Sequence, residues 1–129
     1  MNEQWIDLAT QAQKNAYVPY SKFSVGACLV AKDGTTFCGC NIENASFGLT
    51  NCAERTAIFK AVSVGKREFQ CLVILGDTPE PISPCGACRQ VIAEFCAPDM
   101  PVVLVGKNNA TKTMSVGELL PYMFTAKDL

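Results

Sequence analysis

Two short segments of this chain carry the side chains best suited to chemistry. Residues 51–55 read Asn-Cys-Ala-Glu-Arg, and residues 84–90 read Pro-Cys-Gly-Ala-Cys-Arg-Gln. Cys85 and Cys88 have the spacing of a thiolate pair on one metal ion, because two intervening residues let both sulfur atoms face a single tetrahedral centre. Cys52 is the expected third ligand. The sequence therefore predicts one zinc ion bound by three cysteines.

The open coordination position and Glu54 make this predicted zinc site catalytic in type. Three protein ligands leave one tetrahedral position for water, whereas a closed structural site uses four. Glu54 follows Cys52 by two residues, close enough to reach that position as a proton carrier. Two alternatives remain: the cysteines are buried structural thiols, or Cys40 closes the site as a fourth ligand. The chain has no histidine, so cysteine is its only soft ligand.

Composition limits the other classes of function. A chain of 129 residues forms one domain, residues 1–129, and its 49% hydrophobic content favours association of subunits. Eleven basic and 12 acidic residues give a formal net charge of -1. This balance lacks the excess of positive charge that proteins use to bind nucleic acid. No apolar run is long enough to span a membrane. We expect a small ligand that is not strongly anionic.

The first ten residues and the cysteine content indicate a cytoplasmic protein. Glu3, Gln4 and Asp7 stand where a signal peptide needs a basic start and an apolar stretch. In a reducing compartment, the cysteines outside the predicted metal site are small buried apolar residues rather than a disulfide framework. They are Cys28, Cys38, Cys40, Cys71 and Cys96.

Hydrophobic periodicity predicts the elements of the first half. Apolar residues at steps of three and four predict a helix over residues 2–17, which Pro19 stops. Residues 25–31 and 35–40 have the pattern of strands, and Asp33-Gly34 between them indicates a hairpin. Residues 41–51 show no periodicity and lead directly into Cys52. A structureless segment of that length is typical of a functional loop.

The second half alternates helices and strands. We predict helices over residues 52–64, with Gly65 as C-terminal cap, and over 85–96. Strands are expected over residues 69–75 and 101–105, with a weak edge strand over 111–114. Ser115 and Glu118 form a capping-box pattern for a short last helix that Pro121 ends. These elements predict a three-layer α/β/α sandwich with a mixed five-stranded sheet, parallel at its centre and with the hairpin antiparallel at one side.

The order C-x-E followed by P-C-x-x-C resembles the zinc-dependent nucleoside and nucleotide deaminases. The closer likeness is to the small homotetrameric cytidine deaminases, and it extends in order and spacing over nearly the whole chain. The matching blocks are residues 19–27, 40–45, 51–57, 83–90 and 118–121.

The resemblance implies the fold of a cytidine deaminase and its reaction, the hydrolytic deamination of cytidine and deoxycytidine to uridine and deoxyuridine in pyrimidine salvage. Zinc-bound hydroxide attacks C4 of the ring, and Glu54 is the proton shuttle.

Three thiolates outweigh the charge of zinc. We therefore expect the N-termini of both helices to point at the sulfurs, Arg55 to hydrogen-bond to one or more of them, and Gln90 to hold Arg55.

The substrate contacts are also implied by the resemblance. Residues matching Asn41 and Glu43 bind the ribose hydroxyl, the residue matching Phe23 packs on the base, and the backbone at Ala53 and Ser83 reads the cytosine edge. A carboxylate accepts hydroxyl hydrogen bonds and repels a nearby phosphate. This favours a free nucleoside over a nucleotide.

In the family, neighbouring subunits of a homotetramer complete each pocket, and Phe47 and Phe124 occupy the matching positions here. Phe47 departs from the tyrosine that is common in the family, which puts any role of a phenolic hydroxyl there in question. Three other functions stay open: deamination of another aminopyrimidine nucleoside, deamination of cytosine in a polynucleotide, and a non-catalytic zinc-binding interaction module. The lack of a basic stripe and of clustered aromatics disfavours the polynucleotide.

Overall fold

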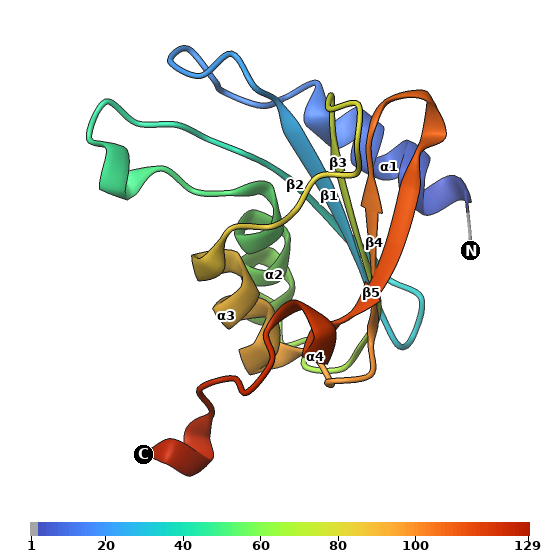
Figure 1. Ribbon diagram of the computed structural model, residues 1–129, viewed down its shortest axis with the longest axis vertical. Coiled ribbons are helices and arrows are strands. Elements are labelled where there is room, and N and C mark those ends of the chain that lie inside the picture. Colours follow the sequence, from blue (N-terminus) through green and yellow to red (C-terminus); the bar gives the residue numbers. More distant parts are fainter. Residues whose placement is uncertain (1–2) are drawn as a thin grey trace.

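A mixed five-stranded sheet forms the middle layer of the computed structural model, which describes residues 3–129 (Figure 1). Its strands lie in the order β2-β1-β3-β4-β5, and only β3 and β4 run parallel, since every other neighbouring pair is antiparallel. The strands are β1 (Val25–Ala31), β2 (Thr36–Cys40), β3 (Phe69–Gly76), β4 (Pro101–Val105) and β5 (Thr111–Ser115).

Helices cover both faces of the sheet. Helix α1 (Glu3–Gln13) lies on one face, and α2 (Ala53–Ser63), α3 (Gly86–Phe95) and the short α4 (Val116–Leu119) lie on the other (Figure 1). Strand β1 is buried along its whole length. Its side chains alternate between the two hydrophobic cores, because successive side chains of a strand point to opposite faces. The predicted three-layer α/β/α architecture is confirmed.

The prediction of a parallel sheet centre is wrong in one respect. Strand β1 lies between β2 and β3 and is antiparallel to both, so among the strands of the sheet described over residues 3–129 the parallel neighbours are β3 and β4. The crossover through α2 does join two strands of the same direction, β2 and β3, but β1 separates them. The all-apolar sequence of β1 explains this placement, because a strand buried on both faces belongs in the sheet interior.

Helix α1 ends at Gln13, earlier than the predicted residue 17, and Asn2 lies outside the described residues. Proline at position 19 is therefore not what ends the helix. The backbone N–H of Tyr17 instead donates to the carbonyl oxygen of Asn41 at 3.0 Å, and Tyr17 forms an isolated parallel bridge with Ile42. The segment after α1 is thus bound to the functional loop predicted over residues 41–51.

Two predicted helix caps are present. Gly65, with φ of +92°, follows α2 and adopts the left-handed conformation that favours glycine. The N–H of Lys66 donates to the carbonyl of Ala61 at 3.0 Å, as in a Schellman motif. At α4, the Ser115 hydroxyl accepts from the N–H of Glu118, and the Glu118 carboxylate accepts from the N–H of Ser115, which completes the capping box.

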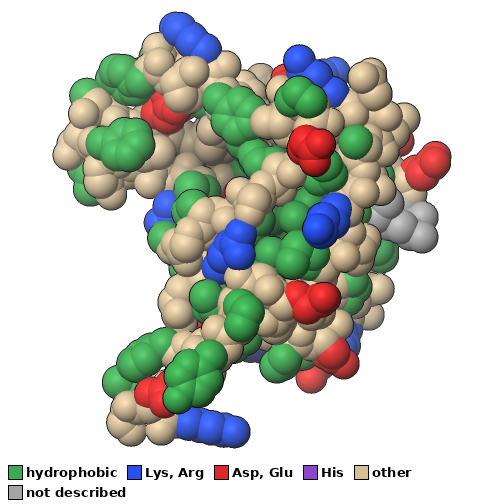
Figure 2. All heavy atoms as spheres, viewed as in Figure 1, with side chains coloured by type: hydrophobic (Ala, Val, Ile, Leu, Met, Phe, Trp, Pro, Cys, Tyr) green, Lys and Arg blue, Asp and Glu red, His purple; other side chains and the backbone are tan. Residues whose placement is uncertain are grey.

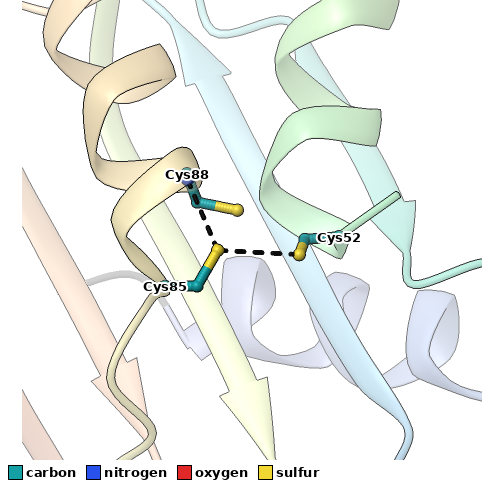
Figure 3. Close-up of side chains that lie close together, drawn as sticks. All are labelled: Cys52, Cys85 and Cys88. Carbon is teal, nitrogen blue, oxygen red and sulfur yellow. Dashed lines mark hydrogen bonds between the residues drawn. The ribbon is translucent and has the colours of Figure 1, made fainter. Parts of the chain in front are cut away.

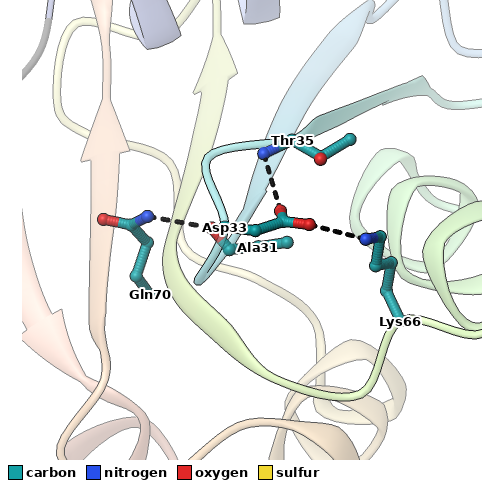
Figure 4. A network of polar contacts seen from close by, with 5 residues as sticks. All are labelled: Ala31, Asp33, Thr35, Lys66 and Gln70. Atoms are coloured by element: carbon teal, nitrogen blue, oxygen red, sulfur yellow. Dashed lines mark hydrogen bonds and ion pairs between the residues drawn. The ribbon is translucent and has the colours of Figure 1, made fainter.

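The β1–β2 hairpin is fastened at its turn (Figure 4). The Asp33 carboxylate accepts from the N–H of Thr35 at 3.0 Å and lies 2.6 Å from the ammonium of Lys66, just beyond α2. The hydrogen bond from Lys66 holds the pKa of Asp33 well below its usual range. Gly34 has φ of +91°, so the Asp-Gly hairpin prediction is confirmed.

Gly39 in β2 is the point where the sheet meets the start of α2. A Cβ atom at this position would lie 2.6 Å from the carbonyl oxygen of Ala53 and 2.7 Å from the backbone nitrogen of Ala57. Only a residue without a side chain allows this approach. The contact places the beginning of α2, with Cys52 before it, directly over the sheet.

Replacing Gly39 with Ala should lower the free energy of unfolding by ~1–3 kcal/mol, because the added methyl group forces α2 away from β2. Urea unfolding followed by circular dichroism measures the change. Gly48→Ala is the matched control, since a Cβ there meets nothing within 4 Å. Equal unfolding midpoints for the two variants would contradict the close-packing argument.

Candidate metal centre

The three cysteines predicted as ligands meet at the beginnings of two helices (Figure 3). Cys52 is the N-cap residue of α2, Cys85 is the N-cap of α3, and Cys88 lies in the first turn of α3. Their sulfur atoms all lie within 4.8 Å of one another, and the sulfurs of Cys52 and Cys85 are 3.9 Å apart. The Cys85 sulfur also accepts from the N–H of Cys88 at 3.5 Å.

This spacing fits a zinc ion. Tetrahedral zinc with Zn–S bonds of ~2.3 Å separates its sulfur ligands by roughly 3.8 Å. Cys40, the alternative fourth ligand, is not part of the cluster. It pairs with Gly26, whose Cβ position points at the backbone of Ala9 in α1, so Cys40 lies on the opposite face of the sheet. The closed four-cysteine site is therefore excluded.

The local charges favour a thiolate at Cys52. The Cys88 thiol, and after it the Arg55 guanidinium, hydrogen-bond to the Cys52 sulfur and lower its pKa to about 5. The Nη2 atom of Arg55 lies 3.3 Å from that sulfur. The Nε atom of Arg55 is buried and, within residues 3–129, has no hydrogen-bond partner. The guanidinium is thus held in the site chiefly by sulfur.

Glu54 lies beside the triad without belonging to it. Its side chain is on the first turn of α2 and only 5% exposed. Burial raises the pKa of the carboxyl group, and the negative charge of the Cys52 thiolate adds to that effect, whereas the Cys88 thiol opposes it. A buried carboxyl group with a raised pKa, next to three sulfur ligands, is suited to accepting and returning a proton.

Gln90 does not hold Arg55, contrary to expectation. Its side-chain amide donates to the carbonyl oxygen of Phe124 at 2.9 Å. The C-terminal segment passes alongside α3 and offers this acceptor, which no local pattern around Gln90 could reveal. Gln90 therefore anchors the C-terminal segment to the helix that carries Cys88.

Arg89 is a site residue that the sequence reasoning missed. Its Nε donates to the carbonyl of Pro84 at 2.8 Å, its Nη1 to the carbonyl of Leu119 at 2.6 Å, and its Nη2 to the hydroxyl of Ser83. Arg89 thus ties the segment before Cys85 to α3 and α4. A cation directly after the second cysteine of the P-C-x-x-C motif was the available signal, because a planar guanidinium can bind several acceptors at once.

Glu43 binds backbone of the segment that follows α1. The side chain is buried, and its Oε1 accepts from the N–H groups of Tyr20 and Ser21 at 3.0 and 3.1 Å. Hydrogen bonding, first from the Ser21 hydroxyl, lowers the pKa of the carboxyl group. Glu43 is therefore an ionised carboxylate at neutral pH, held in a fixed position.

The Asn41 side chain holds the backbone of Val25 at the start of β1 and of Phe23, two residues earlier. Its Oδ1 accepts from the N–H of Val25 at 2.9 Å, and its Nδ2 donates to the carbonyl of Phe23 at 2.8 Å. Phe23 itself is half-buried and packs against the core on the α2–α3 side. One N–H and one lone pair of the Asn41 amide remain for a further partner.

The other predicted contact residues differ in exposure. Ala53 is fully buried at the start of α2, and Ser83 precedes the Pro84-Cys85 turn. Phe47 is 82% exposed in the short 3₁₀ helix η1 (Phe47–Leu49), and Phe124 is 57% exposed in the C-terminal segment. Figure 2 shows hydrophobic side chains on both of these protruding segments. Within residues 3–129, both aromatic side chains are therefore more than half exposed to solvent.

The fold and the three-cysteine site define a zinc-binding α/β/α protein. Residues 1–104 match the family model for the cytidine and deoxycytidylate deaminase zinc-binding region. The chain is 55% identical over 127 residues to a cytidine deaminase of Sporosarcina psychrophila, covering 98% of this chain and 93% of that protein. It therefore belongs to the zinc-binding cytidine and deoxycytidylate deaminase family.

Two further comparisons agree with this assignment. The crystal structure of a cytidine deaminase from Burkholderia pseudomallei superposes with a TM-score of 0.94 at 49% sequence identity, over 96% of this chain and 99% of the other. A blasticidin-S deaminase of Bacillus cereus is 30% identical over 135 residues, covering 97% of this chain and 95% of that protein.

Replacing Cys52 with Ser should remove the bound zinc, because a hydroxyl does not substitute for a thiolate in this three-ligand site. Elemental analysis of the purified protein measures zinc per chain. Cys40→Ser is the matched control: it lies on the α1 face and should keep the zinc of the unaltered protein. Loss of zinc from Cys40→Ser, or full zinc in Cys52→Ser, would contradict this assignment of ligands.

Proposed function

We propose that this chain catalyses the hydrolytic deamination of cytidine and deoxycytidine to uridine and deoxyuridine, with release of ammonia, in pyrimidine salvage. The observation that carries the proposal is the buried Glu54 carboxyl group next to the sulfur atoms of Cys52, Cys85 and Cys88. The similarity to cytidine deaminases over nearly the full chain supports it.

Zinc bound by the three thiolates supplies a nucleophile at neutral pH by making water more acidic. Glu54 accepts a proton from the attacking water, passes it to N3 of the cytosine ring and then assists protonation of the departing amine. One carboxyl group serves all three transfers. Its raised pKa supports the role, because a group that both takes and gives a proton works best when its pKa is near the operating pH.

Arg55 and the two helix N-termini offset the excess negative charge of the thiolates. Each N-terminus carries about +0.5 charge and has a ligand cysteine at its N-cap position. Arg55 adds a full positive charge and a hydrogen bond to Cys52. Withdrawing charge from the sulfurs leaves the metal a stronger Lewis acid.

Substrate recognition is assigned to residues before β1, to the loop that leads into Cys52, to the start of α2 and to the segment before Cys85. Glu43 and Asn41 bind the ribose hydroxyl, Phe23 packs on the base, and the backbone at Ala53 and Ser83 reads the cytosine edge. The fixed, ionised Glu43 supports a preference for nucleosides, because a carboxylate repels a phosphate on the sugar.

The proposed assembly is a homotetramer in which Phe47 and Phe124 complete pockets of neighbouring subunits. Their exposure supports this, since an aromatic side chain gains most from burial at an interface. Gel filtration that finds an active monomer would refute the assembly.

We place the protein in the cytoplasm as one domain over residues 1–129; its eight free cysteines suit a reducing compartment. Within residues 3–129, no helix has the length and apolar character needed to cross a bilayer.

The second candidate substrate is another aminopyrimidine nucleoside. The observation in its favour is the relationship to a blasticidin-S deaminase at 30% identity. Identity of 55% to a cytidine deaminase favours cytidine. Measuring kcat/KM for cytidine and for blasticidin S with the same preparation decides between these substrates.

Incubating the zinc-loaded protein with cytidine should convert it to uridine, which the loss of cytosine absorbance measures. Glu54→Gln should retain its zinc yet lose ~10²-fold or more in kcat, because the amide cannot carry the proton. Zinc content is the control in the same preparation. A Glu54→Gln protein without zinc would make Glu54 a ligand, and unaltered protein without turnover of either nucleoside would overturn the proposed function.

Replacing Glu43 with Gln should raise KM for cytidine roughly 10-fold, with a smaller effect on kcat, because a hydrogen bond to a charged acceptor is replaced by a neutral one. The substitution should also reduce the difference in KM between cytidine and cytidine monophosphate, because the neutral amide no longer repels the phosphate. Glu118→Gln is the matched control, since glutamine can keep the capping box at α4. Equal KM values in the two variants would remove Glu43 from the binding site.

A further inference from the structure

Two cysteines outside the metal centre face each other across the β1–β2 hairpin. Cys28 pairs directly with Cys38 in the antiparallel register. The pairs Ala31–Thr35 and Asn41–Val25 are joined by backbone hydrogen bonds in the same register. Hydrogen-bonded and non-hydrogen-bonded pairs alternate along an antiparallel ladder, so the pair of Cys28 and Cys38 is non-hydrogen-bonded.

A second contact agrees with this assignment. In a non-hydrogen-bonded pair, the backbone groups of the edge strand point away from its partner. The carbonyl oxygen of Cys38 accepts instead from the ammonium of Lys60 on α2, at 2.5 Å. The Cα atoms of such a pair are separated by ~4.5 Å, and their side chains approach each other closely. This separation lies within the range that a disulfide spans.

The two thiols differ in access. Cys28 is fully buried between the sheet and α1, whereas Cys38 is partly exposed on β2, at the end of the strand order. A groove of about 410 Å³ opens onto Cys38, and Leu8, Ala12 and Lys60 are among the residues that line it. A small reagent in this groove reaches Cys38 first and Cys28 only through Cys38.

The surroundings of Cys38 also favour the reactive form of the thiol. The hydrogen bond from Cys28 and the positive charge of Lys60 lower the pKa of Cys38 to about 7, although partial burial opposes them. A thiol with a pKa near ambient pH is the best attacking group in thiol–disulfide exchange, because about half of it is ionised and its thiolate is still strongly nucleophilic. By contrast, the hydrogen bond to Cys38 and burial raise the pKa of Cys28.

We propose that Cys28 and Cys38 form a modification site for low-molecular-weight disulfides, with Cys38 as the attacking thiol and Cys28 as the resolving thiol. The Cys38 thiolate attacks one sulfur of the small disulfide, forms a mixed disulfide and releases one small thiolate. The Cys28 thiol then gives its proton to the first small thiolate and attacks the Cys38 sulfur, which releases the second small thiolate. The products are one protein disulfide and two reduced small thiols.

The site is distinct from the metal centre. Cys28 and Cys38 belong to the hydrophobic cluster between the sheet and α1, whereas the zinc-ligand cysteines lie at the starts of the helices on the other face. The exchange does not depend on the proposed deaminase activity. In a reducing compartment such a disulfide is transient, as expected for a redox-responsive thiol pair.

The test treats the zinc-loaded protein with oxidised glutathione, blocks remaining thiols with N-ethylmaleimide and maps the peptides by mass spectrometry. The unaltered protein should yield a linked peptide pair joining Cys28 to Cys38, with two hydrogen atoms lost, and dithiothreitol should reverse the link. Zinc content should stay unchanged. Absence of the link while the protein retains its zinc would overturn the proposal.

Variants assign the two roles. Cys28→Ala keeps a small apolar side chain in the core, and glutathione should stay attached to Cys38 in this variant because no resolving thiol is present. Cys38→Ala should leave Cys28 unmodified, since Cys28 is fully buried. Cys40→Ala, two residues further along the same strand, is the matched control and should form the Cys28–Cys38 link normally. Glutathione attached to Cys28 in Cys38→Ala, or no adduct in Cys28→Ala, would contradict these roles.

Discussion

The structure depends on one constraint: helices α2 and α3 must begin close together above the sheet. Sulfur atoms 3.9 Å apart, from residues 33 positions apart in the chain, require it. Two tight contacts impose it. Gly39 lets α2 approach the sheet closely, and Arg89 binds the segment that leads into α3. A shift of about 1 Å at either contact would exceed the ~0.2 Å tolerance of metal–ligand distances.

The same arrangement solves an electrostatic problem. Three thiolates carry more negative charge than zinc neutralises, and the site compensates with two helix N-termini and Arg55. Glu54 adds a fourth acidic group, but burial raises its pKa and so eases its protonation. Hydrogen-bond donors lower the pKa of Cys52, and burial raises the pKa of Glu54. The two pKa values therefore shift in opposite directions, so that Cys52 is a metal-binding thiolate and Glu54 is a proton carrier.

The sheet separates two kinds of cysteine chemistry. On the α2–α3 face, thiols at helix starts meet around a metal position. On the α1 face, Cys28 and Cys38 meet across a hairpin whose turn is held by Asp33 and Lys66 (Figure 4). Strand β1 contributes side chains to both cores. The two faces thus share a strand but no sulfur atom, so oxidation of the Cys28–Cys38 pair does not consume the three cysteines of the metal site.

The sequence by itself determined what is local. The P-C-x-x-C spacing, the capping box at Ser115, the glycine after α2 and the Asp-Gly turn each depend on atoms a few residues apart, and the fold class follows from the alternation of helices and strands. The tertiary structure alone decided what joins distant segments. It placed β1 between β2 and β3, and it ended α1 early by pairing Tyr17 with the loop. It also turned Cys40 toward α1 and bound Gln90 to Phe124 rather than to Arg55. The physical reason is that such contacts depend on which chain segment arrives with a free donor or acceptor, and spacing along the sequence carries no record of that.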